Sequence, residues 1–79
     1  MAVRVIVAGS LRDYCPTLSE TGEFFLDDVE GKSVSDVLGC LGIPAGVVAL
    51  VVVNGRQKDK EHVLRGGDTL KLMPVFGGG

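Results

Sequence analysis

The sequence is poor in aromatic residues, with three phenylalanines, one tyrosine and no tryptophan among its 79 residues. Because 46% of the residues are nonetheless hydrophobic, the core of the single domain that this length allows must be aliphatic. Cysteine is also scarce, since only Cys15 and Cys40 are present and neither stands in a C-x-x-C motif. Two cysteines cannot supply the four ligands of a typical iron–sulfur cluster, and their spacing argues against structural zinc.

The chain also lacks an excess of positive charge. Eight lysines and arginines stand against ten acidic residues, so the net charge is −2 and nucleic acid is disfavoured as a partner. The basic residues Arg56, Lys58 and Lys60 lie close together in the sequence. Asp59 and Glu61 alternate with them, however, and this favours a solvated loop over a binding patch.

Long hydrophobic runs are missing as well. The longest near-apolar stretch, residues 43–53, contains a proline and is too short to span a bilayer. Residues 1–4 lead directly into a strand pattern and lack the order of regions that marks a signal peptide. We therefore expect a cytoplasmic protein with reduced thiols and no membrane partner.

Short runs rich in β-branched residues predict five strands, at residues 3–8, 23–29, 47–53, 56–58 and 69–75. The uninterrupted apolar run at 47–53 is typical of a strand buried on both faces. Asn54-Gly55 follows it and is a strong hairpin signal, because both residues tolerate positive φ. Residues 65–68, Arg-Gly-Gly-Asp, predict a tight turn before the last strand.

One helix is predicted between Ser33, a good N-cap with Asp36 at the reciprocal capping position, and Gly42, a good C-terminal stop. Apolar residues recur with helical spacing between them and form one stripe, at Val34, Val37, Leu38 and Leu41. Gly39 weakens this helix by about 1 kcal/mol relative to alanine, so we expect neighbouring backbone to approach there. Cys40, next to the stripe, is expected to be half-buried.

The resulting order β-β-α-β-β-β predicts an α+β fold, with a mixed sheet and one main helix packed across it. A long crossover separates the first and last strands, so we expect them to lie parallel and adjacent. This is the β-grasp, or ubiquitin-like, arrangement. Residues 1–75 would form the domain and residues 76–79 a flexible C-terminal tail.

The glycine tail, Gly77-Gly78-Gly79, is the most informative part of the sequence for function. Glycine has no Cβ, so the walls of a partner's site can approach such a tail on every side. Fully extended, the five residues from Val75 onward reach roughly 17 Å, enough to deliver a carboxylate into a buried site on another protein. The chain has no phosphate-cradling motif of its own, so a partner must activate that carboxylate.

The whole chain resembles the ubiquitin-like sulfur carriers, such as the small subunit of molybdopterin synthase and the thiamine-pathway carrier. Three segments carry the resemblance: VIVAGSLRD at 5–13, VVVNGR at 51–56, and the C-terminal stretch that runs from LRGGD at 64–68 to PVFGGG at 74–79. The resemblance implies that an E1-like enzyme uses ATP to adenylate Gly79 and that a sulfur donor converts the adenylate to a thiocarboxylate. The carrier itself is then not an enzyme and binds no cofactor.

Several alternatives stay open at this point. Many members of the family stop at Gly-Gly, so Gly78 becomes the reactive residue if Gly79 is trimmed. The length and the segment at 10–14 favour molybdopterin or tungstopterin biosynthesis over the thiamine pathway or tRNA thiolation. In the molybdopterin interpretation a large synthase subunit is a further expected partner. The same features suit a protein modifier, or an interaction module with an inert tail.

Two apolar residues before the tail are candidates for docking. Met73 and Phe76, if exposed, would contact the activating enzyme or a synthase subunit, with Gly77 and Gly78 as the narrow approach. The alternative for Phe76 is that it folds back onto the core. His62 stands in a polar stretch and is expected to be solvated.

Overall fold

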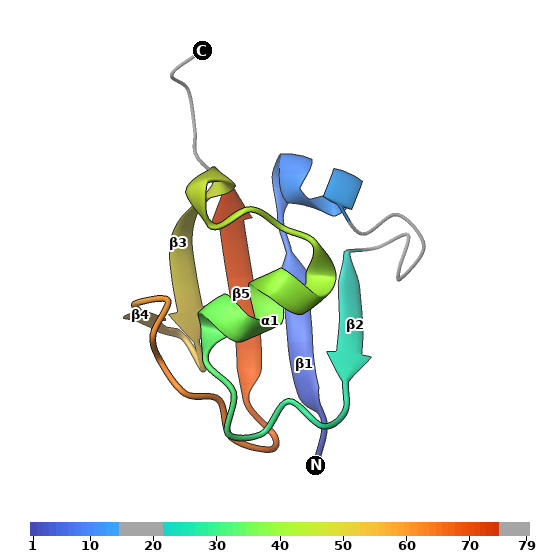
Figure 1. Ribbon diagram of the computed structural model, residues 1–79, viewed down its shortest axis with the longest axis vertical. Coiled ribbons are helices and arrows are strands. Elements are labelled where there is room, and N and C mark those ends of the chain that lie inside the picture. The colour runs from blue at the N-terminus through green and yellow to red at the C-terminus, as the bar shows by residue number, and fades with distance from the viewer. Residues whose placement is uncertain (15–21, 75–79) are drawn as a thin grey trace.

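The computed structural model describes residues 1–14 and 22–74 (Figure 1). It contains one α-helix, α1 (Val34–Leu41), the two 3₁₀ helices η1 (Gly9–Tyr14) and η2 (Ala45–Val47), and the strands β1 (Val3–Val7), β2 (Glu23–Leu26), β3 (Val48–Val53), β4 (Arg56–Lys58) and β5 (Thr69–Pro74). The strands form one sheet in the spatial order β2-β1-β5-β3-β4. Strand β1 is parallel to β5, as expected, and the other pairs are antiparallel. The predicted α+β, β-grasp class is confirmed.

Helix α1 begins and ends where its capping residues predict. The Ser33 side chain accepts a hydrogen bond from the Asp36 backbone N–H at 3.1 Å, and the Asp36 carboxylate accepts one from the Ser33 N–H at 3.3 Å. This reciprocal pair satisfies two of the N–H groups that a helix leaves free at its start. At the other end Gly42 adopts the left-handed conformation, with φ of 75°, and terminates the helix.

The core lies between α1 and one face of the sheet, as Figure 1 shows. The helix buries Val34, Val37 and Leu38 against alternate residues of the central strands. Phe24 is the one aromatic residue among the described core residues, which otherwise are Val3, Val5, Val7, Leu11, Val29, Val34, Val37, Leu38, Ile43, Val48, Val51, Val53, Leu64, Leu70 and Leu72. The prediction of an aliphatic core is therefore confirmed for the described part of the chain.

The opposite face of the sheet is open, which corrects the expectation for the apolar run at 47–53. Residue 47 belongs to η2, and within β3 Leu50 and Val52 are only half-buried while Ala49 is exposed. Among residues 1–14 and 22–74, one eight-residue helix covers one face of the sheet and no second layer covers the other. The run is thus half-buried although its composition is that of a fully buried strand.

Three smaller expectations are also corrected. Strand β2 ends at Leu26, because the chain turns through Asp28 at φ 62° before Val29 is buried. No heavy atom lies within 4 Å of a Cβ added at Gly39, so no neighbouring backbone approaches the helix there. Cys40 is exposed, because its side chain stands outside the apolar stripe. The predicted end of the last strand, Val75, lies outside the described residues.

Candidate functional site

Strand β5 ends at Pro74 and fixes the place of the last described residue before the C-terminal segment. It lies in the middle of the sheet, between β1 and β3, and Leu70 and Leu72 on it are fully buried. Pro74, the last described residue, is also buried and pairs with Val48. Proline donates no backbone hydrogen bond, so it suits the end of a central strand better than its interior. The sheet therefore holds β5 on both sides up to Leu72, and β3 alone pairs with it up to Pro74.

The two 3₁₀ helices flank this end of β5 (Figure 1). Helix η1 follows β1 and is anchored by Leu11, which is fully buried. Gly9 begins it with φ of 55°, and a Cβ at Gly9 would lie 3.1 Å from Pro74 Cγ. The left-handed φ and this close contact both favour glycine at position 9. Helix η2 approaches from the other side, after Pro44 has ended the connection from α1.

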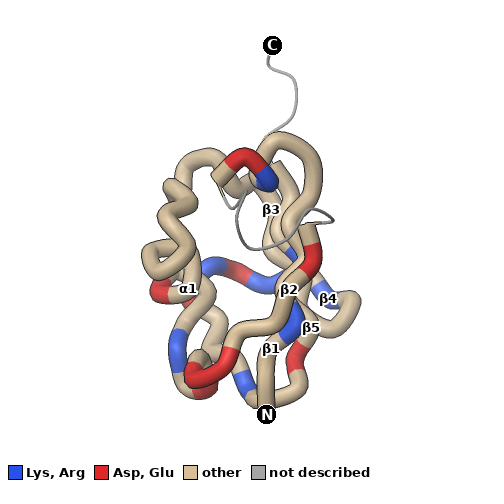
Figure 2. The backbone as a smooth tube through the Cα atoms, turned by 90° about the vertical axis from the view of Figure 1, so that its right-hand side faces the viewer, with Lys and Arg blue, Asp and Glu red and all other residues tan. Residues whose placement is uncertain are grey.

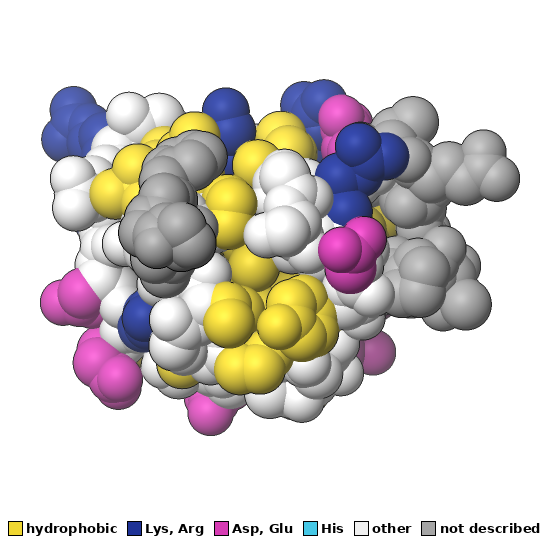
Figure 3. Space-filling model, turned by 90° about the horizontal axis from the view of Figure 1, so that it is seen from above, with side chains coloured by type: hydrophobic (Ala, Val, Ile, Leu, Met, Phe, Trp, Pro, Cys, Tyr) yellow, Lys and Arg dark blue, Asp and Glu magenta, His cyan; other side chains and the backbone are white. Residues whose placement is uncertain are grey.

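A shallow cavity of about 350 Å³ opens between these elements. It is lined by Ser10, Asp13, Tyr14, Gly46, Val47 and Pro74. Tyr14 is 42% exposed, and Val47 is half-buried. Figure 3, which views the molecule from this end, shows hydrophobic side chains gathered across the surface, with basic side chains toward one edge. The end of β5 at Pro74 therefore borders a partly apolar surface.

The open sheet face continues this apolar surface. Met73, predicted as a docking residue, is half-buried and lies opposite Leu50 in the register of β5 and β3. In the next row Ile6 and Val52 flank Lys71. Leu50 and Val52 were missed as surface residues because a continuous apolar run gives no sign that one face is open.

The other predicted site residues, Phe76, Gly77, Gly78 and Gly79, lie outside the described residues. In the described part of the chain, no group of three or more His, Cys, Asp or Glu residues is placed to hold a metal ion. His62 is half-buried in the loop after β4, and its backbone carbonyl accepts a hydrogen bond from the Val34 N–H at 2.9 Å. No helix among residues 1–14 and 22–74 is long and apolar enough to cross a membrane.

Comparison with known proteins places the chain among ubiquitin-like domains. A family model described as Mut7-C ubiquitin matches residues 1–78. No curated protein matches the sequence. Among solved structures, a chain of the complex of subunits 1 and 2 of molybdopterin-converting factor from Helicobacter pylori is similar, with 24% identity, full coverage of both chains and a TM-score of 0.62.

Two further structures are similar over almost their whole length. Small archaeal modifier protein 1 from Haloferax volcanii has 17% identity and a TM-score of 0.70, over 95% of this chain and 98% of that one. Urm1 from Trypanosoma brucei has 20% identity and a TM-score of 0.66, over 99% and 95%. At these identities the likeness shows the fold. The resemblance to ubiquitin-like carriers that the sequence predicts is confirmed at that level.

Proposed function

The chain belongs to the Mut7-C ubiquitin family, and we propose that it is a sulfur carrier whose reactive group is the Gly79 carboxylate. The observation that carries this proposal is the position of Gly77-Gly78-Gly79, which follow β5 in the sequence after only two residues. The sheet holds β5 as far as Pro74. In the sequence, the apolar residues Val75 and Phe76 and then three glycines follow it. Such an arrangement suits delivery of a carboxylate into a narrow site on a partner.

The proposed chemistry takes place on the partner. A carboxylate oxygen of Gly79 attacks the α-phosphate of ATP bound by an E1-like enzyme, and pyrophosphate leaves. Hydrosulfide, or a donor equivalent to it, then attacks the acyl carbon, and AMP leaves with the bonding electron pair. The product is a thiocarboxylate at Gly79. If the last residue is trimmed before activation, the same steps apply to Gly78.

The pathway we propose is molybdopterin or tungstopterin biosynthesis, in the cytoplasm. The support is the structural likeness to a chain of a molybdopterin-converting factor whose subunits 1 and 2 form a complex. On this proposal a large synthase subunit is a second partner of the chain. The chain supplies the carrier and no catalytic machinery of its own. Thiamine biosynthesis and tRNA thiolation are the alternative pathways.

The surface around the exit of β5 would make the first contact with these partners. We assign this role to Met73 and Phe76, with Gly77 and Gly78 as the segment that enters the partner's site. Met73→Lys should raise the KM of adenylation for the carrier, because a charge would replace an apolar contact. Phe25→Lys is the matched control, since Phe25 is 66% exposed on the edge strand β2 of the same sheet.

Intact mass spectrometry tests the reaction itself. The full chain is incubated with ATP, hydrosulfide and the activating enzyme encoded in its host. A mass increase equal to the replacement of one oxygen by sulfur, lost on hydrolysis, is expected for the full chain and absent after deletion of residues 77–79. An unchanged mass in the full chain would overturn the carrier proposal and leave an interaction module with an inert tail.

A second candidate function is protein modification, in which the activated glycine forms an amide with a lysine of a target. The structural likeness to a protein named as a small archaeal modifier favours keeping it. The product recovered from the host distinguishes the two functions. A thiocarboxylate indicates the carrier, and a conjugate joined through Gly79 indicates the modifier.

A further inference from the structure

A second concave site lies at the end of β5 opposite to the C-terminal segment. It has a volume of about 530 Å³ and is lined by Val53, Asn54, Arg56, Lys58, His62, Val63, Arg65 and Asp68. Its walls are the β3–β4 hairpin on one side and the loop that leads into β5 on the other. Strand β5 has six residues, so roughly 17–20 Å separate this site from Pro74.

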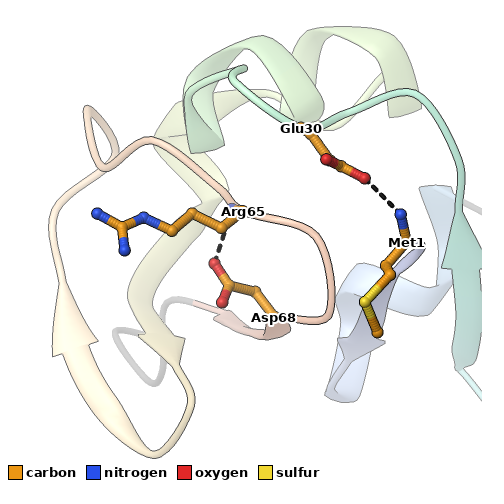
Figure 4. A network of polar contacts seen from close by, with 4 residues as sticks. All are labelled: Met1, Glu30, Arg65 and Asp68. Carbon is orange, nitrogen blue, oxygen red and sulfur yellow. Dashed lines mark hydrogen bonds and ion pairs between the residues drawn. The ribbon is translucent and has the colours of Figure 1, made fainter.

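The polar groups at the base of this site are occupied within the protein. The Asn54 side chain donates to Asp68 Oδ1 at 2.9 Å and accepts from the Thr69 N–H at 2.9 Å. Asp68 Oδ2 accepts from the backbone N–H of Arg65, also at 2.9 Å (Figure 4). The one carboxylate of the site therefore stabilises the turn at 65–68 through these hydrogen bonds.

The rim, in contrast, carries three positive side chains. Arg56, Lys58 and Arg65 form no ion pair within the described residues, whereas Arg4 pairs with Glu23. Figure 4 shows the guanidinium of Arg65 extending away from Met1 and Glu30, with only its backbone engaged by Asp68. Lys60 does not belong to the rim, because its Nζ donates to the Ala45 carbonyl at 2.7 Å.

The clustering of these basic side chains in space is not apparent from the sequence, because acidic residues alternate with basic ones along it. Figure 2 shows basic and acidic positions alternating in the segment that leaves β4. Arg56 and Lys58 are two residues apart on one strand and so project to the same side, and the loop brings Arg65 to join them. The chain as a whole has a net charge of −2, yet the site gathers three basic side chains and His62 around one carboxylate that is already hydrogen-bonded.

The position of β4 at the edge of the sheet limits the kinds of ligand that the site can bind. Cationic residues on an edge strand repel a second copy of the same edge, which ordinarily protects against aggregation. They leave the edge open to a chain of opposite charge. A compact phosphate site ordinarily uses backbone N–H groups, and here those of Arg65 and Thr69 are occupied. The long side chains of Arg56, Lys58 and Arg65 are better suited to bind several carboxylates that are spread along an extended peptide.

Val63 adds an apolar contact to this surface. It is 53% exposed and lines the site together with His62 and the buried Val53. A segment that places an apolar side chain between acidic ones would contact Val63 while its carboxylates meet the rim. We propose that this site binds an acidic peptide segment of a partner protein. The proposal does not depend on the function of Gly79.

Nuclear magnetic resonance of the full ¹⁵N-labelled chain tests the proposal. The probe is a synthetic peptide in which leucine alternates with pairs of glutamate, and the control peptide has glutamine in place of glutamate. We expect saturable amide shifts at residues 56, 58, 62, 63 and 65 with the acidic peptide only. Arg56→Ser/Lys58→Ser should weaken its binding about five- to tenfold, since each exposed charge contact contributes modestly.

The matched control removes two positive charges elsewhere. Lys32→Ser/Lys71→Ser has the same net charge as the test variant, and Lys32 and Lys71 are exposed outside the site. It should retain the affinity of the parent chain to within about twofold. Equal loss in both double variants would overturn the proposal, because it would reduce the effect to net charge. Absence of saturable shifts, or saturation by inorganic tripolyphosphate alone, would overturn it as well.

Discussion

Replacement of Gly22 by alanine tests the packing at the start of β2. Gly22 is buried with φ of +79°, and its carbonyl accepts a hydrogen bond from the Val7 N–H at 2.7 Å. A Cβ at this position would lie 2.7 Å from the Val7 carbonyl oxygen and 3.1 Å from two carbons of Arg12. The Arg12 side chain can move aside. The Val7 carbonyl cannot, because it belongs to the backbone of the central sheet.

Two costs add in this variant. A non-glycine residue in the left-handed region costs about 1–2 kcal/mol. Relief of the overlap with Val7 by a backbone shift costs about 1–3 kcal/mol more. We therefore expect Gly22→Ala to lower the free energy of unfolding by about 2–5 kcal/mol. A domain of this size has only about 3–5 kcal/mol from its core, so the variant should lose a large part of its stability.

Two other glycines provide matched controls for the same chemical change. Gly31 has φ of +83° but no heavy atom within 4 Å of an added Cβ, so Gly31→Ala should cost only the conformational term of about 1–2 kcal/mol. Gly39 lies inside α1 and also has nothing within 4 Å. Gly39→Ala should therefore raise the free energy of unfolding by about 0.5–1 kcal/mol.

Urea unfolding followed by circular dichroism measures all three variants at a common slope. The expected order of stability is Gly39→Ala, parent chain, Gly31→Ala and Gly22→Ala. The reasoning is refuted if Gly22→Ala is as stable as Gly31→Ala, since the overlap with Val7 would then cost nothing. It is equally refuted if Gly39→Ala destabilises the protein.

Two further predictions concern polar contacts. Ser33→Ala removes the N-cap of α1 and should lower the free energy of unfolding by about 1 kcal/mol in the same urea assay, whereas Ser33→Thr keeps the acceptor and should cost less. Burial alone would raise the pKa of Asp68, but hydrogen bonds from the Arg65 N–H and Asn54, with the charges of His62 and Arg65, lower it below its ordinary 3.8. The ionised form therefore stabilises the fold above about pH 4, and this contribution is lost as the pH falls through the folded-state pKa. Unfolding free energy should fall more steeply below about pH 4 in the parent chain than in Asp68→Asn, and parallel curves would contradict the assignment.

Local signals in the sequence predicted the elements that depend on a few neighbouring residues. The capping box of Ser33 and Asp36 and the left-handed stop at Gly42 bound the helix as expected. The Asn54-Gly55 turn forms with φ of 53° and 82°, and its hairpin pairs Val53 with Arg56. Each of these devices closes its own hydrogen bonds within about four residues, so tertiary context has little influence on it.

The surfaces of the molecule were less predictable, because burial of a strand face depends on what covers it. The run at 47–53 has the composition of a strand buried on two faces, and only the placement of one short helix leaves Leu50 and Val52 half-exposed beside Met73. Gly39 similarly gives no local indication that its surroundings are empty.

The sequence by itself determined the order of elements, the helix caps, the hairpin and the glycine tail from which the carrier function is proposed. The tertiary structure determined which basic side chains lie close together. Arg65 joins Arg56 and Lys58 because Asp68 fixes the turn before β5, while Lys60 turns away to the Ala45 carbonyl. Alternation of charge describes neighbours along a chain, but an electrostatic site depends on distances in space, and those are set by how the loop packs against the sheet.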